Sequence, residues 1–202
     1  MTGTVYGLGV GPGDPELLTL KALRILRAAP VIAYPAPETG DSFARQIVAP
    51  HLPGGQQEIA IRMPLGDGQF PKAEIYEGAA DKILEQIAAG RDVAVLCEGD
   101  PFFYGSFLYL YERLVDRCPV QVVPGVSSLM ACAGAEALAI IKVGRHLGRI
   151  RRLLTECARL DGACLVERAT LGTQRIAALR DFGDDAAPYF SMVLVPSPAA
   201  AR

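Results

Sequence analysis

The sequence predicts an α/β protein with two domains: an N-terminal domain built on an open, mostly parallel sheet and a C-terminal α/β domain built on a mixed sheet. Apolar runs of strand length alternate with segments whose apolar residues recur at helical spacing. Three of the strand-like runs end in glycine or proline, as strands followed by tight turns do. The pattern becomes less regular after Pro124 and Gly125, so we expect the domains to span residues 1–124 and 125–202.

The N-terminal elements follow from apolar spacing and from the residues at the ends of helices. A strand at 4–10 ends at the glycines of GVGPGD, and the following helix begins with Asp14 as N-cap and Pro15 in its first turn. The nearly all-apolar run at 92–100 is typical of the middle of a parallel sheet. Further strands are expected at 30–35 and 120–125, and helices at 41–52, 73–90 and 105–116; a Gly- and Pro-containing stretch occupies 53–71.

The C-terminal elements are shorter and less regular. The sequence predicts helices at 126–138 and 146–160, and strands at 139–143, 162–169 and 188–196. The second of these helices is basic, with Arg145, Arg149, Arg151 and Arg152 in or beside it. These cations either form a solvated helix face or contact an acidic substrate.

The composition disfavours several classes of function. Half of the residues are hydrophobic and 21% are charged, and the net charge of −2 offers no electrostatic footprint for nucleic acid. No apolar run reaches the roughly 18 residues of a membrane span, and the start MTGTVYGLG is unlike a secretory signal, so we expect a cytoplasmic protein. The five cysteines form no CxxC pair, which favours buried, reduced thiols over a disulfide framework or a metal site.

The first glycine loop, GVGPGD, has the position but not the chemistry of a phosphate loop. Asp14 stands where the third glycine of GxGxxG belongs, and Pro12 removes an amide donor that would hold a pyrophosphate. The sequence also lacks the GK[ST] of a P-loop. The residues leave two interpretations open, a structural turn and a loop that contacts a ligand.

Two further bends follow strands in the same way. CEGDPFFYGS at 97–106 contains one carboxylate, Asp100, which either caps the next helix or contacts a ligand. VVPGVSS ends with the hydroxyls of Ser127 and Ser128 at a helix start. Loops at the carboxyl ends of parallel strands are where open α/β sheets bind ligands, and three such loops with few cations favour a neutral or cationic ligand.

Six segments, in order along nearly the whole chain, resemble the tetrapyrrole (corrin and porphyrin) methyltransferase family: YGLGVGPGDPELLTLKALRILRAAPVIAYP, DVAVLCEGDPFFYGSFLYLYERL, VQVVPGVSS, IIKVGRHLGRIRR, VERATLGTQRI and APYFSMVLV. YPAP, CEGDPFFYGSF, KVGRH and VERAT favour the subgroup that methylates C-20 of precorrin-2 in cobalamin biosynthesis. The resemblance implies a homodimer of two-domain chains, a tetrapyrrole substrate, no metal, and S-adenosylmethionine in the cleft between the domains. The alternatives are another tetrapyrrole C-methyltransferase and a non-catalytic nucleotide-binding α/β protein.

The resemblance also assigns residues. It places S-adenosylmethionine contacts, largely through backbone groups, at Pro12, Glu98, Gly99, Asp100, Phe103, Ser127, Ser128, Val143 and Ala169. Candidates for the tetrapyrrole are Gly11, Gly13, Asp14, Tyr104, Arg168 and Arg175. It identifies no catalytic base, and it does not distinguish precorrin-2 from its cobalt complex.

The sequence departs from the family in one region. Family members carry a further strand and helix between the ACAG helix and IIKVGR, whereas here only AEALA intervenes, so a segment is expected to be missing between about 135 and 140. Either the protein has a stretch that this sequence lacks, or a true deletion removes a strand and part of the cofactor wall.

Overall fold

The computed structural model describes residues 2–64, 73–103, 105–132 and 137–196. The chain forms two compact units, Met1–Ser127 and Ser128–Arg202, each with its own sheet. Within the described residues, no helix has both the length and the apolar character needed to cross a bilayer.

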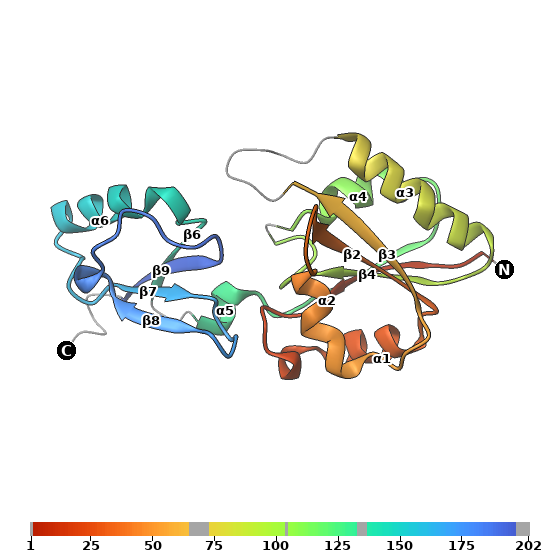
Figure 1. Cartoon of the computed structure of the whole chain (residues 1–202), viewed down its shortest axis with the longest axis horizontal. Coiled ribbons are helices and arrows are strands. Elements are labelled where there is room, and N and C mark those ends of the chain that lie inside the picture. Colours follow the sequence, from red (N-terminus) through yellow and green to blue (C-terminus); the bar gives the residue numbers. More distant parts are fainter. Residues whose placement is uncertain (1, 65–72, 104, 133–136, 197–202) are drawn as a thin grey trace. The chain divides into compact units, whose positions relative to one another are not determined.

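The first unit contains a five-stranded sheet in the order β3-β2-β4-β1-β5, and every pairing in it is parallel (Figure 1). Its strands are β1 (Val5–Gly9), β2 (Val31–Pro37), β3 (Gln57–Met63), β4 (Val93–Cys97) and β5 (Val120–Val123). Its helices are α1 (Leu20–Ala28), α2 (Phe43–Val48), α3 (Ala73–Ala88) and α4 (Phe107–Leu114). The predicted parallel sheet is therefore confirmed.

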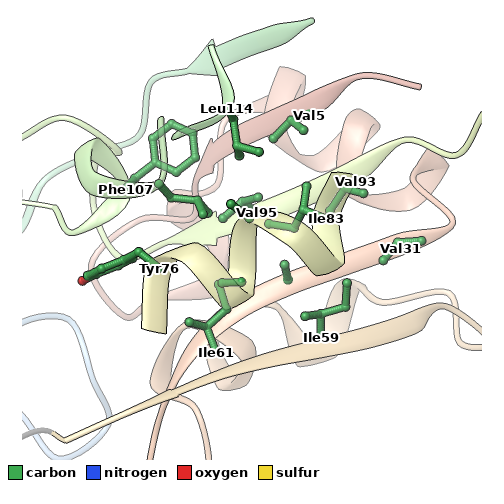
Figure 2. Close-up of a cluster of buried hydrophobic side chains, with 14 of the residues drawn as sticks. Val5, Val31, Ile59, Ile61, Tyr76, Ile83, Val93, Val95, Phe107 and Leu114 are labelled. Carbon is green, nitrogen blue, oxygen red and sulfur yellow. The ribbon is translucent and has the colours of Figure 1, made fainter. Parts of the chain in front are cut away.

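Two hydrophobic layers enclose this sheet. Alternate residues of β4 point to opposite faces, so that Val93 and Val95 join the core beneath α3 and α4 while Ala94 and Leu96 join the core beneath α1 and α2. Figure 2 shows the first of these cores, in which Ile83 of α3 and Leu114 of α4 pack over the strands. Burial on both faces explains the nearly continuous apolar sequence of β4.

Two local features of this unit differ from the sequence predictions. Asp14 does cap a helical turn, but the turn is a 3₁₀ segment, Pro15–Leu17; α1 begins later and uses Thr19 as its own N-cap. Strand β3 lies in the stretch 53–71, for which the sequence analysis predicts no strand. The period-two alternation of buried Ile59, Ile61 and Met63 is the signal that could have identified it.

The second unit contains a four-stranded sheet in the order β6-β9-β7-β8. Its strands are β6 (Ala137–Ile141), β7 (Cys164–Glu167), β8 (Arg175–Ala178) and β9 (Ser191–Pro196), and its helices are α5 (Ser128–Cys132) and α6 (Leu147–Glu156). Leu147 and Leu154 of α6 pack on Leu165 and Val193 of the sheet.

The pairings in this sheet are all antiparallel among the described strands, whereas we expected a mixed sheet. The β6-α6-β7 connection does make β6 and β7 run in the same direction, but β9 lies between them and runs opposite to both. Strand β8 was also not predicted, because its four residues, RIAA, are too few for a pattern.

Two further expectations for this part of the chain change. The helix expected at 126–138 is shorter and forms α5, and residues 137 and 138 belong to β6. Residues 133–136 lie outside the described residues. They include part of the region where a segment is expected to be missing. Cys97 is buried as expected, but Cys157 is exposed. Residues 197–202 also lie outside the described residues.

Candidate functional site

The path of the chain through the first sheet creates a natural binding position between β1 and β4. From β1 the chain moves to β2 and β3 through α1 and α2 on one face, and it returns to β4 and β5 through α3 and α4 on the other face. The neighbouring strands β1 and β4 therefore send their following segments to opposite faces. In open α/β sheets, ligands bind at the carboxyl ends of strands at such a switch point.

The first two glycine loops meet at this position. Gly11 and Gly99 form an isolated antiparallel bridge, with the Gly99 amide donating to the Gly11 carbonyl at 2.8 Å and the reverse bond at 3.4 Å. Both glycines have positive φ, +79° and +65°, which residues with a Cβ adopt rarely. The bridge fixes the backbone of Pro12 and Glu98, which flank it, relative to each other.

The third bend packs against the first two without any side chain between them. A Cβ on Gly125 would overlap the Gly99 carbonyl oxygen and lie 2.7 Å from the Cα of Gly9. A Cβ on Gly9 would lie 2.7 Å from the same oxygen. The three loops therefore come together through bare backbone. The predicted site residues did not include Gly9 or Gly125, although both are glycines at strand ends.

Asp100 ties the second loop to the third bend. Its Oδ1 accepts hydrogen bonds from the amides of Phe102 and Phe103 at 3.0 and 3.2 Å, and its Oδ2 accepts one from the Gly125 amide at 3.1 Å. It does not cap α4, which begins at Phe107 after Ser106. The carboxylate therefore organises the loop backbone, and its predicted contact with a cofactor stays a prediction.

The other predicted residues of the first unit surround this junction. Gly11, Pro12 and Gly13 are buried, as is Ser127, whose Cα would lie 3.6 Å from a Cβ on Gly99. The Asp14 carboxylate accepts from the Glu16 amide at 2.8 Å, and the Phe103 side chain is 44% exposed. Tyr104, a predicted substrate residue, lies outside the described residues.

Glu98 differs electrostatically from the other acids at this edge. It follows β4 directly and is partly buried, and this burial raises the pKa of its carboxyl group to about 7. Among the residues that the structure describes, none donates a hydrogen bond to this carboxyl group. Within this part of the chain, the group has neither the amide donors that Asp100 has nor a neighbouring cation.

The second unit holds the remaining predicted cofactor residues, Ser128, Val143 and Ala169. Ser128 begins α5, and the side chains of Val143 and Ala169 are buried in their own cores, so only backbone atoms of these two could contact a ligand. The backbone around them is unusual. Lys142, Arg168 and Thr170 all have positive φ, of 56°, 49° and 66°.

Two sets of arginines in the second unit bear on the sequence predictions. Arg168 and Arg175, the substrate candidates, are exposed; Arg175 lies 3.7 Å from buried Glu167 and stacks over the ring of Phe182 at 5.0 Å. In the basic helix, Arg151 pairs with Asp185 at 2.9 Å. The exposed cations around it are Arg145, Arg149 and Arg152, which agrees with a solvated helix face.

The comparisons with known proteins identify the family. The sequence pattern of the tetrapyrrole (corrin/porphyrin) methylases matches residues 4–137, which is more than half of the chain. The chain belongs to this family. A precorrin-2 C(20)-methyltransferase of Sinorhizobium sp is 38% identical over 96% of this chain and 95% of the relative. A cobalt-precorrin-2 C(20)-methyltransferase of Salmonella typhimurium is 30% identical over 96% and 97% of the two chains.

Solved structures of tetrapyrrole methylases share the fold. The uroporphyrin-III C-methyltransferase of Thermus thermophilus, complexed with S-adenyl homocysteine, aligns with a TM-score of 0.69 and 26% identity, covering 96% of this chain and 92% of that one. A cobalt precorrin-4 methyltransferase aligns with a TM-score of 0.72 over 96% and 94% of the two chains, and its 18% identity supports the fold alone.

The alignment with the Sinorhizobium methyltransferase is longer than this chain. It extends over 233 positions, whereas the chain has 202 residues, so the relative contains residues that have no counterpart here. This agrees with the expectation that the chain lacks a family segment. Its position near residues 135–140 stays a prediction.

Proposed function

We propose that this chain is an S-adenosylmethionine-dependent C-methyltransferase that transfers a methyl group to the C-20 meso carbon of precorrin-2 or of its cobalt complex, in cobalamin biosynthesis. The observation that carries the proposal is the 38% identity with a precorrin-2 C(20)-methyltransferase over nearly the full length of both chains. S-adenosylmethionine supplies an activated methyl group on a positively charged sulfur.

The chemistry of the switch point supports this cosubstrate. The loop sequences GPGD, EGDPFFYGS and PGVSS contain no Lys or Arg, which disfavours a nucleotide held by its phosphates. The partly buried carboxyl group of Glu98 would instead attract a cation when it is ionised. The glycine junction brings the three loops together through their backbones, and contacts of the cosubstrate with this backbone are part of the proposal.

The contribution of the chain to catalysis is then mainly positional. The Gly11–Gly99 bridge and the three bonds of Asp100 fix the loops before a ligand arrives. Holding donor and acceptor in line is worth up to ~7–11 kcal/mol of the barrier in the best-oriented reactions. The proposal includes contacts of the cosubstrate with Ser128, Val143 and Ala169 and contacts of the tetrapyrrole with Arg168 and Arg175.

Methylation assays test the proposal directly. The protein is incubated with S-adenosylmethionine and either precorrin-2 or cobalt-precorrin-2, and the product is identified by mass and by the position of the new methyl group. A product methylated at C-20 is expected, and the faster of the two reactions identifies the natural substrate. Methylation at another carbon would place the chain in a different branch of the family.

Calorimetry separates the proposal from a nucleotide-binding function. Binding of S-adenosylhomocysteine is expected, and binding of NAD or ATP is not. A protein that binds S-adenosylhomocysteine but methylates neither tetrapyrrole would be a ligand-binding protein. We also propose a cytoplasmic homodimer, and sedimentation equilibrium measures its oligomeric state.

A further inference from the structure

A polar row crosses the second sheet at the end where β7 finishes. Glu167, the last residue of β7, is paired in register with Ser191 of β9 on one side and with Arg175 of β8 on the other. Residues that face each other across antiparallel strands project to the same face of a sheet. Leu165 and Val193 pair in the same way and belong to the core beneath α6, so the polar row projects to that face as well.

This row lies beside backbone that the proposed function assigns to the cosubstrate. In the neighbouring row, Met192 of β9 pairs with both Ile141 and Val166. The chain therefore leaves β6 and β7 at the same end of the sheet, and the predicted cosubstrate contacts Val143 and Ala169 follow these strands directly. Three of the non-glycine residues with positive φ also lie here, and such backbone gathers at functional sites.

Two groups restrain the guanidinium of Arg175. The carboxylate of Glu167, whose side chain is only 7% exposed, lies 3.7 Å from Nη1, and the ring centroid of Phe182 lies 5.0 Å from Cζ. Because the carboxylate is buried, water screens this ion pair less than it screens an exposed one. The face of the ring attracts the cation as well. The Arg175 side chain is nevertheless 60% exposed, so it is restrained and still open to solvent.

The polar row has hydrogen-bonding capacity that the described chain does not use. The 3.7 Å between Arg175 and Glu167 is too long for a hydrogen bond, and within the described residues the guanidinium donates none to another side chain. Its five N–H donors form a planar fork that matches a carboxylate. At the other end of the row, Ser191 is 6% exposed, and its Oγ has no hydrogen-bond partner among the described residues. Buried polar groups are generally paired, so this row has the composition of a polar binding site.

We propose that Glu167 is a positioning residue that holds Arg175 ready to bind a carboxylate of the tetrapyrrole. The inference rests on the proposed function, because precorrin-2 and its cobalt complex carry acetate and propionate side chains around the ring. Arg175 makes the contact, and Glu167 fixes the orientation of the guanidinium before the substrate arrives. This orientation lowers the entropic cost of ordering a long side chain when the substrate binds.

A second ion pair of the same unit provides a matched control. Arg180 and Asp161 lie 3.8 Å apart, and the Arg180 side chain is also 60% exposed, but Asp161 is 94% exposed. Pairs between exposed groups contribute little, because water screens them and both side chains lose freedom when they pair. Arg175→Ala and Arg180→Ala therefore remove equally exposed charges, whereas Glu167→Gln removes a buried acid and Asp161→Asn an exposed one.

Steady-state kinetics with precorrin-2 and cobalt-precorrin-2 at saturating S-adenosylmethionine test the inference, beside fluorescence titration with uroporphyrin III as a stable carboxylated probe. Arg175→Ala should raise KM for the tetrapyrrole and weaken probe binding by about 10- to 100-fold, as loss of a charged hydrogen-bond donor does. Glu167→Gln should have the same effect at about threefold or more. Both should leave kcat and the affinity for S-adenosylhomocysteine unchanged, because the lost contact concerns tetrapyrrole binding.

A double-mutant cycle separates positioning from a purely structural role. In the background of Arg175→Ala, Glu167→Gln should raise KM no further, because the carboxylate acts through the guanidinium. Arg175→Lys keeps the charge but not the planar fork, so it should restore only part of the affinity. Arg180→Ala and Asp161→Asn should leave KM and probe binding unchanged.

Several results would overturn the inference while leaving the proposed function intact. These are unchanged KM and probe affinity in Arg175→Ala, equal losses in Arg180→Ala, or wild-type binding in Glu167→Gln when Arg175→Ala binds weakly. Additive effects in the double variant would also overturn it, because Glu167 would then act independently of Arg175. A wild type that binds uroporphyrin III through Arg175 but methylates no tetrapyrrole would overturn the proposed function alone. A wild type that neither binds the probe nor methylates a tetrapyrrole would overturn both.

Discussion

Replacing Glu98 by glutamine removes a charge that the unliganded protein must otherwise bury above neutral pH. Burial raises the pKa of this carboxyl group from 4.5 to about 7 in the folded protein. Between these values the folded state keeps a proton that the unfolded state has lost. The stability contributed by Glu98 is therefore full below pH 4.5 and falls as pH rises through 7.

The magnitude follows from the size of the shift. Each pKa unit corresponds to about 1.4 kcal/mol, so the wild type loses roughly 2 to 3 kcal/mol between pH 5 and pH 8 through this one group. Glu98→Gln keeps a side chain of the same shape but cannot ionise. Relative to the wild type, its free energy of unfolding should therefore increase by about that amount from pH 5 to pH 8.

Urea unfolding of both proteins at pH 5 and pH 8, followed by circular dichroism, measures this difference. Glu85→Gln, an exposed glutamate on α3, is the control and should show no comparable pH dependence. If Glu98→Gln and the wild type differed by the same amount at both pH values, the carboxyl group would titrate normally. The argument that Glu98 is desolvated at the switch point would then be refuted.

Three further predictions concern the loop junction and the chain itself. Gly125→Ala should lower the free energy of unfolding by about 3 kcal/mol or more and abolish binding of S-adenosylhomocysteine, because the new Cβ would overlap backbone atoms. The control Gly78→Ala, at an open position of α3, should raise the free energy of unfolding by about 0.5–1 kcal/mol. Urea unfolding measures both changes. Asp100→Ala should weaken the binding of S-adenosylhomocysteine measured by calorimetry and lower the free energy of unfolding by about 1–3 kcal/mol, because three backbone amides lose their acceptor. Unchanged affinity would contradict the role of Asp100 in shaping the binding loops. Intact-protein mass spectrometry should give a mass above 21.5 kDa if the protein has the missing family segment, and 21.5 kDa if the deletion is genuine.

The sequence alone established the elements that carry the site. The apolar run ending at Cys97 and the glycine-containing loops after three strands predicted a parallel sheet with ligand-binding loops at its carboxyl edge, because both signals are local in sequence. The family resemblance supplied the cosubstrate. Strand β8 was missed because four residues carry little periodicity. Strand β3 was missed because its glycine- and proline-containing surroundings obscured the alternation of Ile59, Ile61 and Met63.

Only the tertiary structure decided which strands are neighbours and what each acid at the edge does. Sequence patterns carry no information on strand order, so the switch point between β1 and β4 and the antiparallel second sheet became visible only in three dimensions. Asp14, Glu98 and Asp100 look equivalent in the sequence. Their hydrogen bonds and burial separate them, because the free energy of a carboxylate depends on its donors and on its access to water. One donor to Asp100, the Gly125 amide, comes from a bend 25 residues further along the chain.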